Sequence, residues 1–132
     1  MTHPSASRAA FSARIFAIYV FIIGPVLMIV PNLLLALFGL PPTSEVWIRL
    51  IGLLALNIGV FLWVAARHEY THFLHASVAT RCMVFVVIAG FAVLGFAPPV
   101  IMVFGVIDLA GGLWTYFALR ADATATHARL PA

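Results

Sequence analysis

The sequence predicts an all-α protein: a membrane-embedded bundle of four transmembrane helices, with a short interfacial helix after the first span. Composition carries the prediction, because 64% of the 132 residues are hydrophobic and only 8% are charged, whereas soluble domains carry about 25% charged residues. A soluble protein of this size needs more polar surface than these residues supply. The seven basic residues, all arginine, are scattered rather than clustered on one face, which argues against nucleic-acid binding.

The first membrane span follows from an uncharged stretch of 30 residues, Ile15 to Ser44. As one helix it would be about 45 Å long, against a hydrocarbon core of about 30 Å. The Pro31-Asn32 pair offers a break, so we expect a span over 11–30 and an interfacial helix over 32–38. Gly39 and the prolines that follow it are typical of a helix end.

The remaining spans are predicted over 45–68, 76–96 and 99–121. Thr43 or Ser44 is expected to cap the second span, with Glu45 in its first turn. Residues 1–121 then form the transmembrane domain, and 122–132 form a polar cytoplasmic tail that we expect to be loose.

The distribution of arginine predicts the orientation. With four spans, one side of the membrane receives six of the seven arginines, and the other side receives only Arg49. The positive-inside rule then places both termini in the cytoplasm. We therefore expect a multi-pass protein of the bacterial inner membrane. Arg81, predicted about one turn inside the third span, is expected to reach outward to the lipid headgroups.

Asp108 is the candidate functional residue within the membrane. Two spans consume all of the hairpin from Val78 to Phe117, so Asp108 falls near mid-membrane, where an acid costs about 2.5–3.5 kcal/mol and needs a partner. We expect Arg49 to be that partner, and Asn57, at a similar depth, is the competing one. Arg49 could instead extend to the outer headgroups.

Two stripes of small residues support the predicted pairing of the second and fourth spans. Each stripe has the three- and four-residue spacing of one helical face, and small residues let helix backbones approach closely in a membrane. The predicted packing residues are Gly52 and Gly59 on one helix, and Gly105, Gly112 and Thr115 on the other.

A histidine cluster offers the candidate metal site. His68 and His72 match the H-E-x-x-H pattern with Glu69 between them, and His75 follows. On one helix such residues hold zinc, with the glutamate as general base. Because the motif lies at the end of a span and has no soluble domain to form a cleft, we favour a solvated loop. No metal ligand and no catalytic residue is therefore predicted.

Several blocks of sequence resemble small bacterial four-span inner-membrane proteins that are loosely similar to the DoxX-like group. They are Leu37-Phe38-Gly39-Leu40-Pro41-Pro42, Trp47-Ile48-Arg49-Leu50-Ile51-Gly52, Ile107-Asp108-Leu109 and Leu113-Trp114-Thr115. The resemblance covers most of the chain, from the first span to Arg120. It implies a link to quinone or thiol redox systems beside a partner protein. Cys82 is the only cysteine, so the chain lacks the cysteine pair that thiol chemistry would use.

The function favoured by the sequence is that of a non-enzymatic small integral membrane protein, either an accessory subunit or a lipid- or quinone-binding protein. The alternative is a dimeric proton-coupled transporter that uses Asp108. A metal-dependent membrane enzyme that uses the histidine cluster is the lesser alternative. The expected partners are the lipid bilayer and a homodimer or larger membrane complex. No cofactor is predicted, and quinone and lipid are the candidate ligands.

Overall fold

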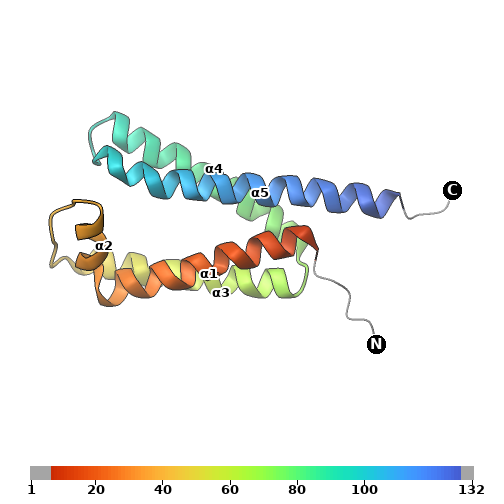
Figure 1. Ribbon diagram of the computed structural model, residues 1–132, viewed down its shortest axis with the longest axis horizontal. Coiled ribbons are helices and arrows are strands. Elements are labelled where there is room, and N and C mark those ends of the chain that lie inside the picture. The colour runs from red at the N-terminus through yellow and green to blue at the C-terminus, as the bar shows by residue number, and fades with distance from the viewer. Residues whose placement is uncertain (1–6, 129–132) are drawn as a thin grey trace.

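The computed structural model describes residues 7–128 as a chain of helices (Figure 1). Four of them are long and apolar enough to cross a membrane, and no strand occurs in this part of the chain. The all-α prediction with four candidate spans is therefore confirmed. In order, the elements are α1 (Arg8–Ile29), α2 (Pro31–Leu37), α3 (Val46–Arg67), α4 (Thr71–Val93), the 3-10 turn η1 (Pro99–Ile101) and α5 (Met102–His127).

Backbone chemistry accounts for the breaks between helices. Pro31 stands at the first position of α2, where its missing N–H costs no hydrogen bond. Gly39 and Gly95 follow α2 and α4 with φ angles of 66° and 75°, in the left-handed region that glycine adopts without strain. Glu69 takes the same region with φ of 56°, and this residue separates α3 from α4.

The helices form two pairs that meet through α1 and α5. Helix α1 packs along α3, α4 packs along α5, and α1 also contacts α5. Figure 1 shows the two pairs side by side, with the start of α1 and the end of α5 at one end of the molecule. We call this the terminal end and the opposite end, which holds α2, the loop end. Contacts between α3 and α4 are sparse, so the bundle is incompletely closed on that side.

Alanines dominate the core that joins the two pairs. Small side chains allow helices to approach closely, and this packing replaces the hydrophobic driving force that lipid does not supply. Large apolar side chains instead cover the outside of the helices, as expected for a surface that faces lipid. The buried core residues are Ala9, Ala10, Ala13, Phe16, Ala17, Val20, Leu62, Ala66, Leu74, Ala118 and Leu119.

The backbones of α1 and α3 approach each other closely at Gly24 and Gly52. A Cβ atom added to Gly52 would lie 2.6 Å from the carbonyl oxygen of Gly24 and 2.6 Å from the amide nitrogen of Met28. Both obstacles are backbone atoms, which cannot rotate away as a side chain would. Glycine at position 52 therefore sets how closely α1 and α3 can pack.

Two carboxylates hold the start of α1 at the terminal end. Glu69 accepts hydrogen bonds from the backbone N–H and the hydroxyl of Ser7. Asp122 accepts from the backbone N–H of Ala9, at 3.0 Å, and from that of Arg8. Carboxylates are stabilising here because the first N–H groups of a helix lack partners within it.

The helix bounds and caps in the structure correct the predicted tail, one predicted helix start and one predicted cap. The expectation of a loose chain from Asp122 is wrong as far as His127, because α5 continues to that residue; residues 129–132 lie outside the described part. Helix α4 begins at Thr71 rather than Ala76. The expected side-chain cap of α3 by Thr43 or Ser44 is also wrong, since Glu45 holds the cap position without a side-chain hydrogen bond.

Candidate ligand site between the helix pairs

A cavity of about 750 Å³ lies between the two helix pairs and receives side chains from α1 to α5. We call it the cleft. Such a volume falls within the range of about 300–1,000 Å³ that is common for small-molecule sites. At the loop end the aromatic rings of Phe38 and Phe104 lie 5.2 Å apart, centre to centre, and both line the cleft.

The walls of the cleft are almost entirely aliphatic and aromatic. Its polar side chains are few and lie on three helices. They are Tyr19 on α1, Ser77, Thr80 and Arg81 on α4, and Asp108 on α5. An apolar pocket with a few polar groups is the usual composition of a site for a small organic molecule.

Arg81 is the least expected residue in the cleft. Its side chain is only 4% exposed, and its guanidinium carbon lies 3.6 Å from the centre of the Phe16 ring on α1. Nη1 donates a hydrogen bond to Thr115 Oγ1 at 3.3 Å. Nη2 is fully buried and has no hydrogen-bond partner in residues 7–128. A buried guanidinium is costly unless its N–H groups are satisfied, so Nη2 is a donor in need of an acceptor.

The expectation that Arg81 reaches the headgroups is therefore wrong, and the position of the helix start explains why. Because α4 begins at Thr71, Arg81 lies ten residues inside it, or about 15 Å from its first residue. Space for the side chain comes from α5. A Cβ on Gly111 would lie 3.3 Å from Arg81 Nη1, and one on Gly112 would lie 3.2 Å from Arg81 Cβ. The adjacent glycines Gly111 and Gly112 are the feature of the sequence that could have indicated a buried arginine on the neighbouring helix.

Thr115 connects Arg81 to the core contact between α1 and α5. The Thr115 hydroxyl donates to the carbonyl oxygen of Gly111 at 3.0 Å and accepts from Arg81. The Ser12 hydroxyl lies 3.1 Å from Thr115 Oγ1. Both hydroxyls are buried. This network fixes one side of the guanidinium and leaves Nη2 outside it.

Asp108 lines the cleft from α5 and is half-buried. Arg81, on the neighbouring helix α4, lines the same cavity. The cleft therefore contains one basic and one acidic side chain.

The predicted pair of Arg49 and Asp108 is not formed. Arg49 is exposed, and its Nη1 donates to the carbonyl oxygens of Met28 and Ile29 at 2.7 and 2.9 Å. These carbonyls end α1, where a helix lacks N–H partners and a cation is stabilising. The competing partner, Asn57, is exposed on α3 and is not among the residues that line the cleft.

The two stripes of small residues also pack against other helices than predicted. Gly52 and Gly59 lie against α1, at Gly24 and Phe21 respectively. On α5, Gly105 and Gly112 lie against α4, and Thr115 contacts both Arg81 and Ser12. The stripes thus lie at helix–helix contacts, but α3 and α5 do not pack along each other within residues 7–128.

The histidine motif is divided between two helices. His68 is the C-cap of α3, Glu69 has the left-handed φ described above, and His72 and His75 lie in the first turns of α4. The two motif histidines therefore do not share the single helical face that a zinc enzyme of this type requires. No group of three or more metal-ligating side chains occurs among the described residues, and the Glu69 carboxylate binds Ser7.

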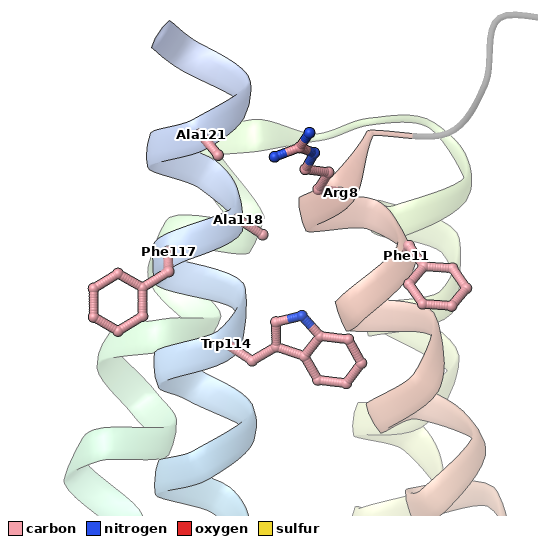
Figure 2. A pocket seen from close by; sticks show the side chains of 6 residues that line it. All are labelled: Arg8, Phe11, Trp114, Phe117, Ala118 and Ala121. Carbon is pink, nitrogen blue, oxygen red and sulfur yellow. The ribbon is translucent and has the colours of Figure 1, made fainter. Parts of the chain in front are cut away.

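A second hollow, of about 560 Å³, lies between α1 and α5 near the terminal end. Figure 2 shows Arg8 reaching across its end towards Ala121, and the nitrogen-bearing edge of the Trp114 indole facing Arg8. Phe11 meets Trp114 edge to face, with ring centres 6.3 Å apart. Arginine and aromatic side chains together are typical of the membrane–water interface. The cleft, with its buried polar groups, is the better candidate for a specific site.

Comparison of the chain with protein-family models, curated proteins and solved structures found no match.

Proposed function

We propose that this integral membrane protein binds a lipid-soluble molecule of the quinone class in the cleft. Such a molecule has a neutral head with hydrogen-bond acceptors and a long apolar tail. The single observation that carries the proposal is Arg81, whose side chain lines this apolar cavity and whose buried Nη2 has no hydrogen-bond partner in residues 7–128. A quinone carbonyl is an acceptor that satisfies this donor without adding charge.

The charges in the cleft favour a neutral head over an anionic one. Arg81 and Asp108 line the same cavity, so with Asp108 ionised an anionic lipid headgroup would gain attraction from one residue and repulsion from the other. A neutral carbonyl avoids this conflict. It accepts a charge-assisted hydrogen bond from Arg81, which is stronger than a bond between neutral groups.

The shape of the cleft suits a long apolar tail. From Arg81 the walls extend to Leu35 and Phe38 near α2, and they are lined by aliphatic and aromatic side chains from every span. The sparse contact between α3 and α4 offers a lateral route from the lipid. Within this proposal the protein is a non-enzymatic binding or accessory subunit of the bacterial inner membrane, which holds the quinone for a partner protein.

The experiment uses the full chain purified in mild detergent. Bound quinone is extracted and quantified by mass spectrometry, and a benzoquinone with a decyl tail is then titrated while thermal unfolding is followed. Ligand at 100 times its Kd stabilises a protein by about 2.7 kcal/mol, so we expect a clear rise in Tm. Arg81→Gln should abolish the rise.

Two further variants make the test specific. Arg67→Gln removes an exposed arginine outside the cleft and should leave binding unchanged. Ala55→Phe fills the cleft wall from α3, a different helix from that of Arg81, and should block binding even if Arg81→Gln fails to fold. Absence of both co-purified quinone and a Tm rise in the wild type would refute the proposal, as would equal binding by Ala55→Phe.

A proton-coupled transporter is the second candidate, because Asp108 lines the cleft. An acid in a membrane cavity is a common element of proton relays. This candidate requires that Asp108→Asn fold normally and abolish proton-coupled flux of a substrate in liposomes. Quinone binding that persists in Asp108→Asn, with no proton flux in the wild type, would favour the binding protein.

A further inference from the structure

The outward face of α3 carries a regular pattern that the cleft does not use. Six residues alternate at spacings of four and three, which is the heptad spacing of helices that pack side by side. All six are exposed. They are Val46, Leu50, Leu53, Asn57, Val60 and Val64. We call this row the α3 seam.

Asn57 is the one polar residue of the seam. It is the twelfth of the 22 residues of α3, so it lies at the middle of the span. Its side chain makes no hydrogen bond within residues 7–128 and is not part of the cleft. A polar group exposed to hydrocarbon without a partner costs several kcal/mol, and polar side chains in spans almost always face protein. Asn57 therefore requires a partner from outside this bundle.

The seam lies away from every contact that α3 makes within the chain. The α1-facing side of α3 is marked by Gly52 and Gly59, and the cleft-facing side by Ile51 and Ile58. With 100° between successive residues of a helix, Asn57 points away from both sides. A partner on the seam would therefore leave the cleft and the α1 contact intact.

We propose that the α3 seam packs against the α3 seam of a second copy of this chain, with the two Asn57 side chains hydrogen-bonded to each other. Two copies inserted with the same topology present parallel α3 helices. A twofold axis then places each seam residue opposite itself. The asparagine side chain is self-complementary, because its carbonyl accepts and its amide donates. A single asparagine in an otherwise apolar heptad row is the known device that fixes register in parallel helix dimers.

The chemistry favours a second copy over lipid as the occupant. Acyl chains offer no acceptor or donor to Asn57 at mid-membrane, whereas a second Asn57 at the same depth offers both. The inference is independent of the ligand in the cleft, since no residue of the seam lines it.

Cysteine cross-linking tests the geometry in liposomes made from the full chain. In a Cys82→Ser background, Val60→Cys places a thiol on the seam and Ile58→Cys places one on the cleft-facing side. Both positions are exposed within the chain. We expect oxidation to link Val60→Cys into dimers and to leave Ile58→Cys monomeric. The reverse pattern, or equal cross-linking of both, would overturn the proposal.

Energy transfer between donor- and acceptor-labelled chains tests Asn57 itself, as the lipid-to-protein ratio is raised. Hydrogen bonds between membrane helices contribute about 0.6–2 kcal/mol, so Asn57→Leu should weaken the dimer by roughly 3- to 30-fold. Asn57→Gln should retain part of the affinity. Because Asn57 makes no bond within the described chain, both variants should fold, as thermal unfolding can verify. A wild type that is monomeric at every ratio, or a dimer unaffected by Asn57→Leu, would contradict the proposal.

Discussion

The guanidinium carbon of Arg81 lies 3.6 Å from the centre of the Phe16 ring, across the contact between α4 and α1. The aromatic face carries negative charge density and attracts the cation, and this attraction is stronger away from water. Phe16 is itself buried in the core. The pair therefore joins the two halves of the bundle at the polar part of the cleft.

A double-mutant cycle should detect this pair. We expect Phe16→Leu and Arg81→Gln to show a coupling of about 1–2 kcal/mol in the free energy of unfolding, in line with a desolvated cation–π contact. The measurement is thermal or chemical unfolding in mild detergent. Phe16→Leu combined with Arg120→Gln, which changes an exposed arginine on α5, is the control and should be additive. Additivity of the first pair would mean that the observed stacking contributes nothing to stability.

Glycine at position 52 should be required for packing. Gly52→Ala forces a Cβ against the backbone of α1, and overpacking of this kind costs about 1–3 kcal/mol. Gly90 on α4 is the matched control, because an added Cβ there meets nothing within 4 Å. Gly90→Ala should be neutral or stabilise the protein by up to about 1 kcal/mol. Equal loss of Tm in both variants would argue against the tight contact of α1 with α3.

Arg49 and Asp108 should behave independently. Arg49 binds the last carbonyls of α1, and losing hydrogen bonds from a charged donor costs about 1.5–3 kcal/mol. Arg49→Ala should therefore destabilise the protein alone and in the Asp108→Asn background by the same amount, within about 0.5 kcal/mol. Unfolding of the four proteins of this cycle measures the coupling. A coupling well above that value would restore the pairing that the sequence stripes predict.

The topology can be read with reporter fusions. The six-to-one distribution of arginine predicts both termini in the cytoplasm. A reporter active only outside the cytoplasm should therefore be active after Pro42 and after Pro98, and inactive after Tyr70. Activity after Tyr70 alone would contradict the predicted orientation.

Much of the architecture can be predicted from the sequence because it depends on local chemistry. Apolar length defines the four spans, and Pro31 and Gly39 mark breaks that backbone sterics dictate. The boundary of α4 is the exception. His72 and His75 follow Thr71 and do not suggest a membrane span, and the helix nevertheless includes them. Because the helix begins five residues earlier than predicted, Arg81 lies inside the bundle rather than at the interface.

The choice of helix partners was decided only by the tertiary structure. In lipid, apolar side chains gain little by choosing one helix over another, so stripes of glycine indicate that a helix packs closely but not against which neighbour. Gly52 packs against α1 because the two backbones fit closely there. Arg81 packs against α5 because Gly111 and Gly112 leave space for its side chain. The sequence by itself determined the spans and the presence of an intramembrane acid. The fold decided that this acid shares a cleft with Arg81, because only three-dimensional packing brings α4 and α5 together around the guanidinium.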